Sequence, residues 1–241
     1  MVAGAVRARA EEVLRALRAA SDPERREVTR GYFPSRLEIL GVSAPELRRI
    51  LRPLARALRS APAAEVLATA RALRDTGAHE ARQIAFELVG GRRDVIAVLD
   101  AKAVEALGEG NDNWASVDGF SVYVAGPAWR EGAVRDRDVL RWCRSADRWW
   151  RRTALVSTVA LNMRSRGGSG DVPRTLRVCR ALATDADPMV AKALSWALRA
   201  LVGVDAGAVR TFLVEHEDGL PALVRREVGN KLATGLKSGR R

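Results

Sequence analysis

The sequence predicts an all-α fold, a HEAT-like or armadillo-like solenoid of helix pairs (an α-α superhelix) with a basic concave face. Apolar residues recur at helical spacing through most of the chain, and no stretch has the alternation of a convincing strand. Longer helical segments begin near His79, Asn113, Arg148 and Asp187, at intervals of 34, 35 and 39 residues. This period is typical of helix-pair repeats, in which the second helices of successive pairs line one surface.

The first helix is expected over residues 5–20, where apolar positions recur at helical spacing between charged ones. A second, shorter helix opens at Asp22-Pro23-Glu24 and ends at Gly31-Tyr32-Phe33-Pro34, because proline lacks an amide and restricts the residue before it. Ser43-Ala44-Pro45-Glu46 has the form of a capped helix start, and this helix runs to about residue 58. Further helices are expected over residues 63–75, 79–90, 92–107, 113–125, 136–145, 148–165, 171–183, 187–202, 205–215 and 220–236.

We expect a single domain over residues 1–236, followed by a basic tail over residues 237–241. A chain of 241 residues can bury a sizeable core, and a hydrophobic content of 47% argues against wholesale disorder. The 41 Lys and Arg against 29 Asp and Glu give a net charge of +12, which favours a phosphate-bearing partner. Composition does not separate DNA, RNA and an anionic membrane, and heavy use of Ala and Arg also fits a GC-rich genome.

Residues that hold metals or form disulfide frameworks are sparse. Cys143 and Cys179 lie outside any CxxC or Cys/His cluster, and the two histidines, His79 and His216, are isolated from other ligand types. We therefore expect no metal and no cofactor. The N-terminus is too often interrupted by Arg and Glu for a signal peptide, and no apolar run approaches membrane-spanning length. These features predict a cytoplasmic, nucleoid-associated protein without membrane contact, and we expect a monomer.

A tryptophan and a carboxylate four residues apart, Trp114 and Asp118, form the strongest candidate site. On a helix both side chains leave one face. Further candidates are expected on the surface lined by the second helices, again in pairs four residues apart: Arg148 with Arg152, and Lys192 with Trp196.

One carboxylate among aromatic faces suits a reaction whose transition state gains positive charge. Cleavage of the bond between deoxyribose and a base passes through an oxocarbenium-like sugar, and an alkylated purine is already cationic, so it leaves with little acid catalysis. A charge pair about 4 Å apart is worth on the order of 4 kcal/mol at an effective dielectric of about 20, roughly a thousandfold in rate. Indole faces at Trp114 and Trp196 would add about 0.5–2 kcal/mol each beside a cation.

Four stretches carry a resemblance to a known family: Leu40-Gly41-Val42 with Pro45-Glu46-Leu47-Arg48-Arg49, Trp114-Ala115-Ser116-Val117-Asp118, Trp149-Trp150-Arg151-Arg152, and Lys192-Ala193-Leu194-Ser195-Trp196. On these stretches the chain, from about residue 30 to 235, resembles the DNA alkylation repair glycosylases of the AlkD-like type, which are built from HEAT-like helix pairs. The resemblance implies excision of cationic 3- and 7-alkylpurines from duplex DNA, as in base excision repair, without a deep base pocket.

The resemblance also implies roles for individual residues. The catalytic tryptophan and aspartate of the family's W-x-x-V-D stretch fall on Trp114 and Asp118. The tryptophan of its K-A-x-x-W-x-L-R stretch, another wall of the catalytic cleft, falls on Trp196. The DNA-contacting arginine of its W-x-x-R-x-A stretch falls on Arg152, and a tyrosine near the first helices falls on Tyr32.

The chain departs from the family pattern at two positions. Ala115 stands where a second acidic residue can follow the tryptophan, and Trp150 stands where an aliphatic residue is common. Both changes bear on substrate range more than on the reaction. The sequence also leaves open a specialisation for bulky natural-product adducts, which would suggest self-resistance rather than general repair.

Other interpretations remain open from the sequence. A helical tryptophan usually packs in a core, and we assign Trp129, Trp142 and Trp149 to packing. A lone helical aspartate such as Asp118 commonly pairs with a cation, and Arg152 is a candidate partner. A basic scaffold that binds DNA or RNA without catalysis, or a protein-binding adaptor, would keep the same fold. The pairing of an acid with an indole argues against the scaffold, because phosphate binding needs neither.

Overall fold

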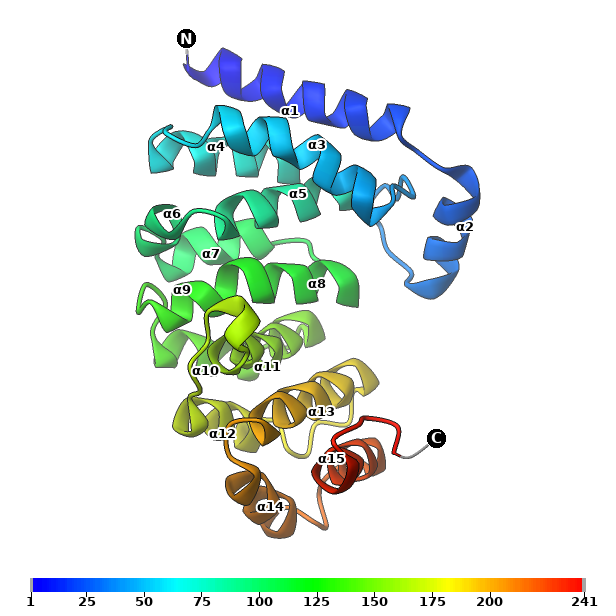
Figure 1. Ribbon diagram of the computed structural model, residues 1–241, viewed down its shortest axis with the longest axis vertical. Helices are drawn as coiled ribbons and strands as arrows, with labels where there is room; N and C mark the ends of the chain where they lie inside the picture. Colours follow the sequence, from blue (N-terminus) through cyan, green and yellow to red (C-terminus); the bar gives the residue numbers. More distant parts are fainter. Residues whose placement is uncertain (1, 240–241) are drawn as a thin grey trace. The chain divides into compact units, whose positions relative to one another are not determined.

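The computed structural model describes residues 2–239, and the secondary structure of this range is helical, which confirms the predicted all-α fold. The only β-type pairing within it is an isolated bridge between Glu38 and Ala78. The chain divides into two compact units, unit 1 up to Val124 and unit 2 from Ala125 onward. Within each unit, helices stack in HEAT-like pairs (Figure 1).

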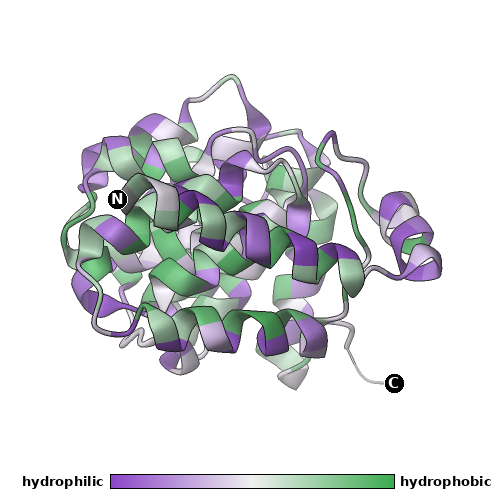
Figure 2. Cartoon of the chain, turned by 90° about the horizontal axis from the view of Figure 1, so that it is seen from above, coloured by the Kyte–Doolittle hydropathy of each residue, from purple (hydrophilic) through white to green (hydrophobic). Residues whose placement is uncertain are grey.

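Unit 1 is built from eight α-helices among the described residues: α1 (Val2–Ala19), α2 (Pro23–Tyr32), α3 (Ala44–Ala57), α4 (Ala63–Asp75), α5 (His79–Gly90), α6 (Arg93–Ala97), α7 (Ala101–Gly108) and α8 (Trp114–Phe120). Helix α1 packs against α3 and α4, α4 packs against α5, and α5 packs against α8 (Figure 1). The helices carry an apolar and a polar side (Figure 2), and the apolar sides bury Leu17, Phe86 and Phe120 completely.

A buried glutamate fixes the turn that leads into α3. The carboxylate of Glu80, on α5, accepts a hydrogen bond from the Gly41 amide at 2.7 Å and from the Leu40 amide at 3.1 Å. Gly41 has a φ of +77°, and a Cβ there would lie 2.5 Å from the amide nitrogen of Arg26. Glycine is therefore required where the chain passes α2, and the side chain of Ser43 then caps α3, as predicted.

The helix predicted over residues 92–107 is wrong in one respect, since the structure divides it into α6 and α7. The side chain of Asp100 accepts a hydrogen bond from the Ala103 amide at 2.7 Å and caps α7. An aspartate side chain competes with backbone carbonyl oxygens for hydrogen bonds from backbone amides. It therefore starts a new helix more readily than it continues an existing one.

The helix predicted over residues 113–125 is longer and less regular than expected. After α8 the chain forms a π-helix, η1 (Ser121–Ala125), and continues as α9 (Gly126–Arg130). Pro127 has no amide to donate and lies at the start of α9, directly after the wider turn of the π-helix, so the chain continues as a helix through this residue.

Unit 2 continues from α9 through α10 (Asp136–Cys143), α11 (Arg148–Asn162), the short 3-10 helix η2 (Arg164–Arg166), α12 (Val172–Ala181), α13 (Pro188–Val202), α14 (Ala206–Glu215) and α15 (Ala222–Thr234). Helix α11 packs against α9, α10 and α13, and α13 packs against α15. The core includes Trp129, Leu155, Leu194 and Phe212, each almost completely buried. Trp129 and Trp142 are core residues, as predicted, and Trp149 is half-buried.

The basic tail expected over residues 237–241 is described as far as Gly239, and Arg240 and Arg241 lie outside the described residues. Lys237 Nζ lies 3.3 Å from the carboxylate of Glu227 on α15. The Glu227 carboxylate also accepts a hydrogen bond from the Ser195 hydroxyl at 2.6 Å. The start of the tail is therefore held against unit 2 by a partly buried acid.

Candidate functional site

The predicted pair, Trp114 and Asp118, lies on α8, one turn apart and half-buried. Trp114 is the first residue of the helix. The side chain of Asn113, which is 1% exposed, caps this end by accepting a hydrogen bond from the Ser116 amide at 2.9 Å. A rigid, capped first turn therefore carries the indole, and the carboxylate follows on the same face.

Two aromatic residues from the end of α2 hold the indole of Trp114. The Tyr32 ring meets it edge-on, with centroids 5.3 Å apart, and the Phe33 ring does the same at 5.6 Å. Tyr32 is 70% exposed, whereas Phe33 is buried and also contacts the ring of His79 at 5.1 Å. The structure thus brings Tyr32, a predicted DNA contact, to Trp114 and adds Phe33 and His79, which the sequence did not suggest.

A cluster of hydrogen bonds, the Asp112 clamp, ties the segment after α2 to the loop before α8. The Ser35 hydroxyl donates to one oxygen of Asp112 at 2.5 Å, the Arg36 amide donates to the other at 2.6 Å, and Asn113 Nδ2 donates to the Ser35 oxygen at 3.2 Å. Burial works against the charged form of Asp112, but these hydrogen bonds outweigh it and hold its pKa below the ordinary value. The clamp thereby fixes Tyr32 and Phe33 beside Trp114.

His79 closes the same region from α5. Its Nδ1 lies 2.9 Å from the hydroxyl oxygen of Ser116, which also accepts a hydrogen bond from Asn113 Nδ2 at 3.2 Å. Burial lowers the pKa of His79, although the carboxylates of Glu80 and Asp112 oppose this shift. A neutral imidazole therefore supports the first turn of α8, and His79 acts through packing and hydrogen bonding rather than as a cation.

The predicted residues of unit 2 occupy α11 and α13, which pack together. Arg148 is exposed, lies 3.3 Å from the carboxylate of Asp187 and covers the ring of Trp149 at 5.4 Å. Arg152 is 5% exposed and donates a hydrogen bond to the carbonyl oxygen of Met189, in the first turn of α13, at 2.5 Å. It therefore holds α13 against α11 in this structure, a role that the sequence did not indicate.

The remaining candidates of unit 2 share one face of α13. Lys192 is exposed, with no ion pair among residues 2–239, and Trp196 follows one turn later, half-buried. Trp114, Asp118, Tyr32, Phe33 and His79 are called the Trp114 group. Neither this group in unit 1 nor the pair on α13 in unit 2 includes a set of metal ligands. The described part of the chain has no group of three or more His, Cys, Asp or Glu that could hold a metal ion. No helix in that part is long and apolar enough to cross a membrane.

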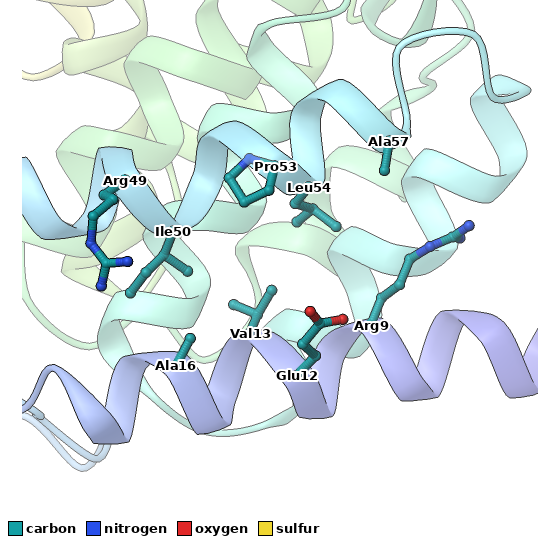
Figure 3. A pocket seen from close by; sticks show the side chains of 9 residues that line it. All are labelled: Arg9, Glu12, Val13, Ala16, Arg49, Ile50, Pro53, Leu54 and Ala57. Carbon is teal, nitrogen blue, oxygen red and sulfur yellow. The ribbon is translucent and has the colours of Figure 1, made fainter.

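A separate hollow of about 360 Å³ lies between α1 and α3 (Figure 3). Its floor is apolar, with Val13, Ile50 and Leu54, and its rim carries Arg9 and Glu12. None of the predicted site residues lines it. The hollow marks where α1 leaves space beside α3, and it does not belong to the Trp114 group.

Comparison with known families identifies the chain. A profile of the family described as DNA alkylation repair enzyme matches residues 13–232, which include the candidate residues of both units. No curated protein sequence matches the chain. Since the family match spans most of the sequence, the protein belongs to the DNA alkylation repair enzyme family, and it acts on DNA.

Proposed function

We propose that this protein is a DNA glycosylase that hydrolyses the N-glycosidic bond of cationic 3- and 7-alkylpurines in duplex DNA, without deep base flipping. The arrangement of Trp114 and Asp118 on one face of α8 carries the proposal. Tyr32 and Phe33 buttress the indole, so an aromatic wall stands one helical turn from a carboxylate. This pairing suits a cationic sugar better than it suits phosphate, which a carboxylate repels.

The proposed reaction needs no cofactor. As the bond between C1′ and the purine nitrogen breaks, its electron pair neutralises the alkylpurinium, and positive charge builds on the sugar. The Asp118 carboxylate stabilises that charge, by about 4 kcal/mol for charges about 4 Å apart at an effective dielectric of about 20. It also orients the water that adds to C1′ and accepts the proton that this water releases. The indole of Trp114 faces the cation and contributes about 0.5–2 kcal/mol more.

Residues of unit 2 have supporting roles in this proposal. Arg148, Arg152 and Lys192 hold DNA phosphates, and Trp196 contacts the deoxyribose of the damaged nucleotide. Lys192 and Trp196 are available for this because their helix face is at least partly exposed. Arg152 would have to exchange its bond to the Met189 carbonyl for a phosphate, or act indirectly by fixing α13.

The proposal is tested by release of 7-methylguanine and 3-methyladenine from methylated duplex DNA. We expect Asp118→Asn to slow release by roughly a thousandfold, because it removes the charge that stabilises the sugar cation. Binding of undamaged duplex by this variant should change little. Asp218→Asn, at an exposed aspartate between α14 and α15, is the matched control and should behave as the wild type.

The outcomes separate the alternatives. Equal losses of release and of duplex binding in Asp118→Asn would contradict the catalytic role of the carboxylate. Wild-type protein that binds duplex DNA but releases neither methylated base would be assayed on DNA with bulky alkyl adducts. Release only from that DNA would identify an adduct specialist, and no release from either would leave a non-catalytic binder.

A further inference from the structure

Helix α3 carries a row of arginines to which no role has been assigned so far. Arg48, Arg52, Arg56 and Arg59 recur at intervals of four, four and three residues, which places them on one side of the helix and of the turn that follows it. All four are exposed, and none has a carboxylate within 4 Å among residues 2–239. These four residues are called the α3 stripe. Neighbouring Arg49, by contrast, is neutralised by Glu46 at 2.7 Å.

The stripe faces away from α1. Ile50, Pro53 and Ala57 line the hollow beside α1, as Figure 3 shows. At 3.6 residues per turn, the stripe lies roughly 140° around the helix from that side. From Arg48 to Arg56 it extends over about 12 Å at 1.5 Å per residue. It is therefore a linear row of positive charge on an open face of unit 1.

The chemistry of the stripe fits a polyanion backbone. Guanidinium groups bind phosphate through paired N–H donors, and the stripe contains no lysine. An anionic membrane is a poorer fit, because the apolar residues Leu47, Ile50 and Leu54 of α3 are buried and leave nothing to insert into lipid. The exposed large apolar residues of the described chain all lie outside α3.

We infer that the α3 stripe binds backbone phosphates of the duplex about five or six base pairs from the lesion. This inference rests on the proposed function, which puts the lesion at Trp114. Helix α3, which carries the stripe, packs on α5, and α5 packs on α8, so α5 lies between α3 and α8 (Figure 1). Two helix spacings of about 8–10 Å give about 16–20 Å, and the duplex rises about 3.4 Å per base pair. The stripe thus determines how much flanking duplex the protein requires on one side of the lesion.

The test compares two triple variants that remove the same charge. The stripe variant carries Arg48→Gln, Arg52→Gln and Arg56→Gln. The control carries Arg15→Gln, Arg137→Gln and Arg210→Gln, at exposed arginines on α1, α10 and α14 that also have no ion pair within the described range. Circular dichroism and thermal melting first establish that both variants are folded. Binding of undamaged duplex is then measured against salt concentration.

For the stripe variant we expect a flatter dependence of log K on log salt, by about 0.9 for each phosphate that the variant no longer neutralises. At about 0.1 M salt this corresponds to roughly eightfold weaker binding for each such phosphate. Shortening one arm of a lesion-centred duplex from about ten to about three base pairs should weaken binding by the wild type and the control. The stripe variant should not respond to that truncation.

Equal losses in the two triple variants would overturn the inference, because net charge alone would then explain the binding. Unchanged DNA binding by the stripe variant, with loss of binding to phosphatidylserine vesicles, would overturn it in favour of a membrane surface. The proposed function fails separately. If the wild-type protein releases no base but the stripe variant shows the expected change of salt slope, the phosphate site is supported and the glycosylase function is contradicted. If the wild-type protein releases base but the two triple variants bind DNA equally, the glycosylase function is supported and the phosphate site is contradicted.

Discussion

At the scale of single residues, the candidate site depends on groups that do not touch the proposed substrate. His79 contacts Phe33 through its ring and Ser116 through Nδ1, so it links the aromatic wall to the first turn of α8. Its neutral state follows from burial, which outweighs the carboxylates of Glu80 and Asp112. The position of Trp114 is therefore coupled to the protonation of a histidine on another helix.

This coupling predicts a pH dependence of stability. The pKa of His79 is lowered in the folded protein. Below about pH 6.5, His79 therefore binds a proton in the unfolded chain but stays neutral in the folded chain. The free energy of unfolding should then fall with decreasing pH, by up to about 1.4 kcal/mol per pH unit, until the folded pKa is reached. In His79→Asn this fall should disappear. Urea unfolding between about pH 7 and pH 5 measures the free energy of unfolding. The two proteins compared are His216→Asn and the double variant His79→Asn with His216→Asn, so His79 is their only difference in histidine content. Parallel curves for the two proteins would contradict the assignment.

The residues of the site were predictable to the extent that their signal is local. Trp114 and Asp118 share a helix face because they are four residues apart, and this follows from helical geometry alone. The Asp112 clamp joins residues 77 positions apart, and the bond from His79 to Ser116 spans 37 positions. No periodicity encodes such contacts, because they depend on how α2 and α5 pack against α8. Arg152 shows the same limit, since its bond to the Met189 carbonyl depends on the packing of α11 on α13.

At the scale of elements, seven of the described α-helices begin where the sequence places an Asp or Ser cap. Asp22, Ser43, Asp187 and Asp205 each accept backbone hydrogen bonds at a helix start close to the predicted one. The sequence was less informative at Asp100, because this cap lies inside an apolar periodic stretch that predicts one continuous helix. It also did not predict the π-helix η1, for which we find no residue pattern.

The close approach of the π-helix η1 to the end of α5 gives a testable prediction. At Gly90, the last residue of α5, a Cβ would lie 2.6 Å from the carbonyl oxygen of Tyr123 in η1. We expect Gly90→Ala to destabilise the protein by about 1–3 kcal/mol, because the backbone of η1 must move. Gly229→Ala on α15, where a Cβ meets nothing within 4 Å, should instead stabilise the protein by about 0.5–1 kcal/mol. Chemical unfolding measures both, and a stabilising Gly90→Ala would show that η1 does not approach α5 this closely.

At the scale of the whole molecule, positive charge and buried core are distributed over two units with their own interiors. The net charge of +12 suits a protein that acts on DNA, but many cations are already neutralised, as Arg49 is by Glu46 and Arg151 by Asp185. Affinity for DNA should therefore depend on the unpaired cations rather than on the total. The α3 stripe in unit 1 and Lys192 in unit 2 are among them within the described chain.

The two cysteines give a probe of unit 2 in the intact protein. Cys143 on α10 and Cys179 on α12 are buried, and burial raises the pKa of the Cys143 thiol to about 12 and that of Cys179 further above its usual value. Because the thiolate is the reactive form and both side chains are buried, we expect labelling to require that unit 2 opens. We expect thiol reagents at about pH 8 to label the native protein at least about 10³-fold more slowly than the chain unfolded in guanidinium. Cys143→Ala and Cys179→Ala, measured separately, assign each rate. Rapid labelling of Cys179 in the native protein would show that α12 opens from unit 2 without global unfolding, and its packing on α13 would then contribute little to stability.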